Sequence, residues 1–440
     1  MVNFVGSSTL NSINTKAVTC PACGLLCDDL IIARDIQDRQ NNLKVIANGC
    51  AKSIAFFERP TLAASPRVAG KNTDIETAIA RAVEILRATQ HLLISGLGTD
   101  VLGMRAVLSL AEKSGATMDH MNSTSSMRNL LVLQNSGWQI TTLTEVRNRV
   151  DFLLIISSDI VSTFPRFFER VVWNASSMFG QDTAAREIVY LGGRDLNTQP
   201  GVAPDGRQPD VLPCDVDKLP EVIAALRALV AEKTLAVNEV AGIAVSDLQK
   251  LAARLTAAKY GVIAWAAAAL DFPQAELTIQ NITGLIATLN ETTRCSGLPL
   301  SGSDGDVGAY NTSAWTSGYP FRNSYRRGYP DYDPYHYSTE GLLADNEADA
   351  LMWISSFNPE RVPPTSRIPT IVLGHPAMQF EHEPEVFIPL AVPGIDCTGT
   401  QFRSDSSVAL PLKKLRETTL PTLADVLSSI EIRLAAKHAD

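Results

Sequence analysis

The chain has 440 residues, of which 45% are hydrophobic and 19% are charged. These proportions are typical of a folded globular protein and exclude an intrinsically disordered chain. Asp and Glu outnumber Lys and Arg by 47 to 38, so the formal net charge is −9. Because nucleic acids and anionic membranes are bound by clustered cations, neither is expected as a partner.

The first sixty residues are expected to form two parts. Residues 1–17 are polar and are predicted to be a flexible tail without the features of a secretory signal. Residues 18–60 contain four of the seven cysteines. No apolar run in the sequence reaches the ~18–20 residues that a membrane-spanning helix requires.

An α/β pattern begins near residue 73. Thr73 and Glu76 have the spacing of a capping box, and apolar residues then recur at helical intervals up to Leu86. Residues 91–98 are predicted to form a buried strand that ends in glycines. Residues 102–114 have the pattern of a second amphipathic helix.

Further apolar runs have the length and composition of buried parallel strands, at 152–156, 188–191, 261–265, 351–354, 370–373 and 386–390. Helical patterns occur between several of them, at 220–235 and 245–259, and a last helix is expected at 423–437. Strands that alternate with helices indicate open, mostly parallel sheets that are covered on both faces. The predicted fold class is therefore α/β.

The division into domains is predicted from the changes in pattern. A cysteine-rich domain at 18–60 is followed by an α/β domain at 61–215 and a second α/β domain at 216–440. Residues 296–340 are rich in Gly, Ser, Pro and Tyr and hold seven of the nine tyrosines, so they are predicted to be a long insertion loop. A loop of this length is usually functional or covered by a partner.

The clustered cysteines indicate a metal site. Cys20, Cys23, Cys27 and Cys50 have the spacing C-x2-C-x3-C-x22-C. Four thiolates suit a soft metal and can hold either a [4Fe–4S] cluster or a zinc ion. The alternative is a set of free buried thiols. An odd number of cysteines with one tight cluster argues against a disulfide framework, so a reducing, cytoplasmic location is expected.

Two weaker signals concern glycines and histidines. Gly96 and Gly98 follow an expected strand and precede a helix, where a phosphate could bind. The third glycine of that motif is replaced by Val101, which favours a structural turn. His375 and His382 are seven residues apart on a proline-interrupted segment, so both are predicted to be partly exposed loop residues rather than metal ligands.

The motif Cys20-Pro-Ala-Cys-Gly-Leu-Leu-Cys-Asp-Asp29, with Lys52 two residues after Cys50, resembles the cluster loop of molybdopterin oxidoreductases. It is most similar to the start of the B subunit of formylmethanofuran dehydrogenase. Further matching segments follow in the same order, at 314–320, 346–354 and 392–400. The resemblance implies a formate dehydrogenase/DMSO reductase-like arrangement of domains 1–3, with a small cysteine domain and Rossmann-like parallel-sheet domains, and without a C-terminal β-barrel domain.

The chain departs from that family where its catalytic members ligate molybdenum or tungsten. The family's cysteine or selenocysteine and the following histidine fall near Ser125 and Ser126 here, and no cysteine occurs between Cys50 and Cys214. The resemblance therefore implies no catalytic residue and no Mo/W-pterin in this chain. It leaves Lys52, Gly96 and Gly98 as candidate cofactor contacts. His120 could replace the lost proton relay, but a packed polar residue is favoured.

In lacking these metal-binding residues, the chain is similar to the B subunit of a formyltransferase/hydrolase complex of methylotrophic bacteria. The resemblance implies a non-redox scaffold that docks the A, C and D subunits of such a complex. The complex converts a formyl-tetrahydromethanopterin-type carrier to formate through formyl-methanofuran. The alternatives are an active Mo/W formylmethanofuran dehydrogenase subunit and a structural Fe–S or Zn module. The tyrosines at 310–337 either dock a partner or pack their own domain.

Overall fold

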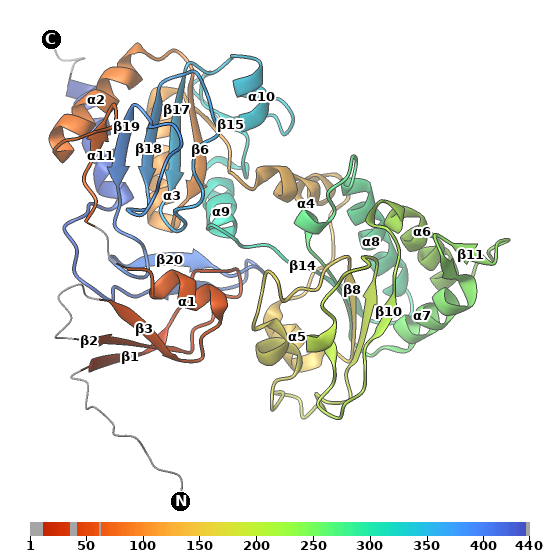
Figure 1. The fold of residues 1–440 in the computed structure, drawn as a ribbon. Coiled ribbons are helices and arrows are strands. Elements are labelled where there is room, and N and C mark those ends of the chain that lie inside the picture. Colours follow the sequence, from red (N-terminus) through yellow and green to blue (C-terminus); the bar gives the residue numbers. More distant parts are fainter. Residues whose placement is uncertain (1–11, 36–41, 61–62, 437–440) are drawn as a thin grey trace, which may run out of the picture. The chain divides into compact units, whose positions relative to one another are not determined.

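The computed structural model describes residues 12–35, 42–60 and 63–436, and Figure 1 shows their fold. The chain divides into two units. Unit 1 consists of residues 1–121, 303–403 and 409–440, and unit 2 consists of residues 122–302 and 404–408. Each unit contains its own β-sheet.

Unit 1 is built on a nine-stranded sheet in the order β16-β15-β7-β6-β17-β18-β19-β4-β5. Four parallel, fully buried strands form its centre, β6 (Leu92–Gly98), β17 (Ala350–Ser355), β18 (Thr370–Gly374) and β19 (Val386–Pro389). Short strands complete the edges, β4 (Arg67–Val68), β5 (Lys71–Asn72), β7 (Thr117–Met118), β15 (Asn323–Ser324) and β16 (Asp331–Tyr332). The strands at the centre are apolar on both faces because helices and loops cover both sides.

The helices of unit 1 pack through amphipathic faces. They are α2 (Ile75–Ala88), α3 (Val101–Ser114), α9 (Asp306–Ser317), α10 (Thr339–Ala344) and α11 (Leu423–Ala435). Helix α11 contacts both α2 and α3, and α3 also contacts α9 and β6. The apolar stripe of each helix is thereby removed from water.

A small cysteine-containing layer also belongs to unit 1. Strands β1 (Ser12–Val18), β2 (Leu30–Asp35) and β3 (Leu43–Ala47) form an antiparallel sheet, and α1 (Ala51–Phe57) follows. A two-stranded ribbon, β20 (Gly399–Phe402) with β21 (Ala409–Leu412), completes the unit.

Unit 2 contains a parallel five-stranded sheet in the order β10-β9-β8-β13-β14. The strands are β8 (Phe152–Ile156), β9 (Glu187–Leu191), β10 (Asp210–Leu212), β13 (Gly261–Trp265) and β14 (Cys295–Pro299). The helices are α4 (Ser123–Ser136), α5 (Leu143–Arg149), α6 (Leu219–Val230), α7 (Val245–Ala257) and α8 (Glu276–Leu289), with a hairpin of β11 (Glu239–Val240) and β12 (Ile243–Ala244). Their apolar faces and the sheet share one core around Trp265.

The predicted α/β class with parallel sheets is confirmed, but the units differ from the predicted domains. The boundary expected at 215/216 lies inside unit 2. Strands β8, β9 and β10 precede that point, whereas β13 and β14 follow it, and all five share one sheet. The expected tail also differs, because residues 12–17 lie in β1 and residues 1–11 lie outside the described residues.

Two predicted local features also differ from the structure. Residues 296–340 are not a loop, because they include most of β14, all of α9, and both β15 and β16. Helix α2 is capped by Asp74, whose carboxylate accepts a hydrogen bond from Thr77 N, and not by the expected Thr73. Asp74 is one residue closer to the first helical turn, where the free backbone N–H groups lie.

Candidate functional site

The cysteine loop of unit 1 is a tight turn between β1 and β2. Cys20 N donates to Cys27 O at 2.9 Å, and Leu26 N donates to Cys23 O at 3.2 Å. These three cysteines are buried, while Cys50 is partly exposed at the start of α1. Burial raises the pKa of the Cys20 thiol well above its ordinary value, and the other three sulfurs raise it further. The turn holds Cys20, Cys23 and Cys27, and Cys50 is close enough to influence Cys20 electrostatically.

The gathered sulfurs do not form a closed ligand set. Among the residues that the structure describes, no three or more His, Cys, Asp or Glu side chains are arranged to hold a metal ion. Burial also raises the pKa of the Cys23 thiol, although the nearby Lys52 ammonium opposes this effect. A [4Fe–4S] cluster or zinc at these cysteines stays a prediction.

A cavity of about 550 Å³ lies beside this loop, entirely within unit 1. One wall is the face of α1 that carries Lys52, Ala55 and Phe56, with Arg59 just beyond the end of the helix. This face reflects the helical spacing of i, i+3 and i+4. The remaining wall is formed by Pro21 and Ala22 of the cysteine loop and by residues far along the chain, Ser303, Asp304, Phe357, Asn358, Glu360, Arg361 and His375.

The place of this cavity in the sheet makes it the candidate functional site. The strand order reverses between β6 and β17, since β7 continues on one side while β18 and β19 continue on the other. Phe357 and His375 follow the carboxyl ends of β17 and β18, respectively. In open parallel sheets, ligands bind beyond the carboxyl ends of the strands at such a point of reversal.

The cavity holds several cationic groups. Arg361 is paired with Asp304, with 2.8 Å between Nη2 and Oδ2. Neither Lys52 nor Arg59 makes a hydrogen bond or an ion pair with any residue that the structure describes, and both are partly buried. Glu360 is exposed, so solvent screens its charge.

His375 adds a neutral donor to the cavity. The expectation of a partly exposed loop residue was wrong, because its side chain is packed after β18 and is 7% exposed. Burial lowers the pKa of His375 to about 3, with further lowering by Arg59 and Arg416. Ala377 N donates to Nδ1 at 3.0 Å, so the single ring proton of the neutral form lies on Nε2.

At the Gly96–Gly98 turn, the protein's own atoms fill the space that a phosphate would need. Gly96 has φ = +80°, and a Cβ there would lie 2.5 Å from Ile354 O. At the adjoining N-terminus of α3, the Asp100 carboxylate accepts hydrogen bonds from Gly103 N at 3.0 Å and Leu102 N at 3.3 Å. A phosphate at this helix end would meet a like charge. These contacts favour the structural turn, and neither glycine lines the described cavity.

The predicted vestigial metal-ligand residues are divided between the units. His120 belongs to unit 1, where it is 1% exposed and stacks on Phe321 with 5.0 Å between ring centroids. Burial lowers its pKa to about 4, as expected for a packed neutral residue. Ser125 and Ser126 lie in the first turn of α4 in unit 2. The Ser125 hydroxyl donates to Asn122 O at 3.0 Å, a local contact at the helix start.

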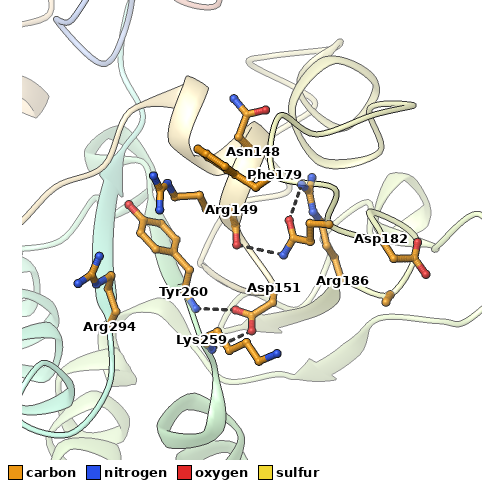
Figure 2. A pocket seen from close by; sticks show the side chains of 11 residues that line it. Asn148, Arg149, Asp151, Phe179, Asp182, Arg186, Lys259, Tyr260 and Arg294 are labelled. Atoms are coloured by element: carbon orange, nitrogen blue, oxygen red, sulfur yellow. Dashed lines mark hydrogen bonds between the residues drawn. The ribbon is translucent and has the colours of Figure 1, made fainter.

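A second cavity, of about 440 Å³, lies in unit 2 (Figure 2). Asp151, Tyr260 and Arg294 immediately precede β8, β13 and β14, so it opens at the amino ends of the strands. Its buried cation, Arg186, donates to Val172 O at 2.5 Å and Arg147 O at 2.7 Å. These carbonyls lie at helix C-termini, whose partial negative charge compensates the guanidinium. Both features indicate a structural role.

Sequence reasoning missed most of the first cavity. Lys52 was identified through its motif, but Arg59, Asp304 and Arg361 were not. The seven-residue spacing of Lys52 and Arg59, two turns of a helix, was the one local signal available.

The fold and cavity define the class of this protein as a two-unit α/β protein with an N-terminal cysteine loop and parallel sheets. No helix in the described part of the chain has the length and apolarity to cross a bilayer. No family model matches the sequence.

Comparison with known proteins identifies relatives that span nearly the whole chain. The chain is 30% identical to the Fhc B subunit of the formyltransferase/hydrolase complex of Methylorubrum extorquens over 382 residues, covering 84% of this chain and 98% of the relative. It is 27% identical over 413 residues to the B subunit of the tungsten-containing formylmethanofuran dehydrogenase 2 of Methanocaldococcus jannaschii, covering 91% and 93%. The chain therefore belongs to the family formed by the B subunits of formylmethanofuran dehydrogenase and of the Fhc complex.

A solved structure has the same fold. One chain in the crystal structure of the formyltransferase/hydrolase complex FhcABCD from Methylorubrum extorquens, determined with methylofuran, superposes with a TM-score of 0.71. The match has 27% sequence identity and covers 86% of this chain and 100% of that chain. The resemblance predicted from the cysteine motif is confirmed at the level of the family.

Proposed function

We propose that this chain is the B subunit of a formyltransferase/hydrolase complex and serves there as a non-redox structural subunit. Its partners are the A, C and D subunits, as in the FhcABCD complex. The complex transfers a formyl group from a tetrahydromethanopterin-type carrier to a methanofuran analogue and releases formate. The observation that carries the proposal is the match to the Fhc B subunit over 98% of that protein.

The residues at the family's metal-ligand position support a structural role. By the resemblance, Ser125 and Ser126 fall near that position, so the chain offers no thiolate there. A serine oxygen can ligate molybdenum in some relatives, but here the family's histidine is missing as well. The Ser125 hydroxyl already donates to Asn122 O within its own helix turn. His120 stacks on Phe321, which supports the role of a packed polar residue. In domain terms, we assign the β1–β3 layer and the two parallel-sheet cores to formate dehydrogenase/DMSO reductase-like domains 1–3.

One observation favours a second function, that of an active Mo/W formylmethanofuran dehydrogenase subunit. The chain is 27% identical to a tungsten-containing relative and keeps all four loop cysteines. If a cluster or a zinc ion is held there, Cys20, Cys23, Cys27 and Cys50 are its ligands. When bound, a cluster would supply electron transfer and zinc would supply structural cross-linking.

Purification of the tagged full-length chain from its native host, without oxygen, tests the two functions. We expect the A, C and D subunits to co-elute in fixed ratio and the complex to release formate from its formyl carrier. Elemental analysis should find neither molybdenum nor tungsten in stoichiometric amount. One tungsten or molybdenum per complex, together with carbon dioxide reduction, would contradict the structural role. Iron with sulfide, or zinc, that is lost in Cys20→Ser would assign the cysteine loop.

The tyrosine-rich segment at 310–337 is a candidate docking surface, and the co-elution experiment can test it. Tyr325 is buried and Tyr319 stacks on Tyr332 at 5.2 Å, so part of the segment packs its own unit. Tyr329 and Tyr335 are 55% and 73% exposed, and we assign them to intersubunit contact because aromatics are enriched at interface cores. Changing both to Ser should weaken co-elution, whereas Met178→Ser in unit 2 should not. Unchanged co-elution would reject this surface.

A further inference from the structure

The rim of the cavity in unit 2 carries two cations that the fold does not use (Figure 2). The Lys259 ammonium and the Arg294 guanidinium are exposed, and neither makes a hydrogen bond or an ion pair with any residue that the structure describes. They precede the paired strands β13 and β14, where Gly261 N donates to Arg294 O at 2.9 Å. Two like charges at the ends of neighbouring strands repel each other. A bound anion would remove this repulsion.

The lining of the cavity has the opposite sign of charge to the whole chain. The chain is formally −9, whereas cations outnumber carboxylates in the lining. The cations are Arg149, Arg186, Lys259 and Arg294. Of the carboxylates, Asp151 accepts hydrogen bonds from two backbone N–H groups before β13, both at 2.8 Å, and Asp182 is exposed to solvent. Burial and repulsion by Arg147 lower the pKa of the Arg186 guanidinium to about 10, as expected where the potential is positive.

The cavity also presents aromatic surface. Phe179 is 59% exposed, and the Arg149 guanidinium covers one face of its ring at 4.3 Å from the centroid. Tyr260 supplies a second ring, and the hydrogen bond between its hydroxyl and Thr141 Oγ1, at 2.9 Å, fixes the orientation of that ring. An exposed aromatic ring beside a cavity gains free energy when an apolar group covers it. The lining therefore suits a ligand with an anionic part and a ring.

The inner wall of the cavity is held in place by the fold itself. The buried Arg186 has a structural role there, and its Nη2 donates to Gln181 Oε1 at 3.0 Å. Gln181 Nε2 donates in turn to Val150 O at 2.8 Å, which anchors the segment that carries Phe179 beside the start of β8. Because the walls are preformed, binding loses little conformational entropy. The volume of about 440 Å³ lies within the range of sites for small organic molecules.

We propose that the cavity of unit 2 binds a small aromatic molecule that carries a carboxylate or a phosphate group. Lys259 and Arg294 hold the anionic group, and the ring of the ligand packs against Phe179 and Tyr260. The site lies at the amino ends of the strands and entirely within unit 2. It goes beyond the structural role proposed above and does not depend on it, since it uses no residue assigned to intersubunit contact or to the cysteine loop.

Equilibrium dialysis of the full-length chain in its purified complex tests the site, with benzoate, phenyl phosphate and cyclohexanecarboxylate as probes. We expect a saturable component of benzoate or phenyl phosphate binding whose affinity falls at least tenfold in Arg294→Gln and in Lys259→Gln. Phe179→Ala should weaken the same component several-fold. Cyclohexanecarboxylate has the charge of benzoate without its aromatic ring and should bind at least threefold more weakly. The tighter of the two aromatic probes identifies the anionic group, and either result supports the site.

Lys233→Gln and Met178→Ala are the matched controls. Lys233 is another exposed lysine of unit 2, and Met178 is the exposed neighbour of Phe179, but neither lines the cavity. Both variants should change the affinity by less than twofold. Arg294→Lys keeps the charge and should retain most of the affinity, which separates loss of the charge from loss of folding.

Protection of Lys259 from acetylation locates the bound probe inside the complex. The tighter aromatic probe, at saturation, should slow acetylation of Lys259 by acetic anhydride at least threefold and leave Lys233 unchanged, as measured by peptide mass spectrometry. Equal acetylation of Lys259 with and without the probe would overturn the proposal. So would equal affinities in the wild type and in Arg294→Gln. Equal binding of benzoate and cyclohexanecarboxylate would reject an aromatic ligand.

Discussion

At the scale of single residues, burial decides the protonation of the histidines in unit 1. His375 and His120 are 7% and 1% exposed, and the pKa of each lies well below the ordinary value of 6.5. Desolvation disfavours the charged imidazolium in both cases, and Arg59 and Arg416 add repulsion at His375. Both rings are therefore neutral donors at pH 7 rather than cations.

This burial predicts a dependence of stability on pH. Unfolded His375 takes up a proton below about pH 6.5, whereas the folded residue stays neutral down to about pH 3. The unfolded state therefore binds more protons in that window, and the free energy of unfolding falls as the pH falls. One histidine contributes at most about 1.4 kcal/mol per pH unit. Urea unfolding between pH 7 and pH 4 should show a shallower decline in His375→Asn than in the wild type.

His382 provides the matched control for this measurement. It is exposed on the same segment of the chain, so His382→Asn should leave the wild-type decline unchanged. Identical declines in the wild type and in His375→Asn would contradict the burial argument.

Single residues also show which parts of the candidate site the local sequence cannot identify. The four cysteines and Lys52 could be identified from their spacing because they lie within 33 consecutive residues, 20–52. Asp304, Arg361 and His375 carry no local signal that links them to Lys52. They reach the same cavity because the strands and helix they flank are neighbours in unit 1.

At the scale of elements, the turn between β6 and α3 shows how a phosphate-like motif becomes structural. Asp100 is 6% exposed, and its carboxylate accepts hydrogen bonds from Leu102 N, Gly103 N and Thr400 N. It thus caps α3 and ties the helix to β20. A buried carboxylate with three backbone donors fills the place that an anionic ligand would need.

Removing this carboxylate should destabilise the fold. Asp100→Ala leaves the three N–H groups without their acceptor and is expected to cost about 2–3 kcal/mol of unfolding free energy. Asp100→Asn keeps one acceptor oxygen and should cost less. Urea denaturation of both variants measures the difference. Equal stability of Asp100→Ala and the wild type would show that water replaces the cap.

Helix α9 shows why an element can escape prediction. Its sequence, DVGAYNTSAWTS, is rich in small and polar residues, so no apolar stripe marks it. It is helical because Val307, Ala309, Thr312 and Ser313 are buried against the rest of unit 1. Thr312 Oγ1 donates back to Gly308 O, which satisfies its hydroxyl inside the unit. Tertiary packing here outweighs weak local propensity.

At the scale of the whole molecule, long-range strand pairing decides the division into units. Strand β13 pairs with β8, more than a hundred residues earlier, and with β14. The core around Trp265 is drawn from residues 132–295, all of which belong to unit 2. Unit 2 therefore has its own hydrophobic core, which is the requirement for independent folding.

This division predicts the behaviour of two fragments. Residues 122–302 keep the five-stranded sheet and lose only the return segment, 404–408, so this fragment should unfold cooperatively on heating. Residues 216–440, the domain expected from sequence, contain β13 and β14 without β8 and should not unfold cooperatively. Circular dichroism during thermal unfolding distinguishes the two. A cooperative 216–440 fragment with a disordered 122–302 fragment would favour the sequence-derived boundary.

The sequence by itself determined the class of the fold, most of the buried strands and the family. It did so because apolar periodicity and cysteine spacing are local patterns that need no knowledge of distant contacts. For that reason, the strands predicted at 152–156 and 261–265 have the same bounds as β8 and β13 in the structure. Only the tertiary structure decided the two units, the burial of His375 and the cationic cavity. These features depend on strand order, and strand order is set by the burial of surfaces that lie far apart along the chain.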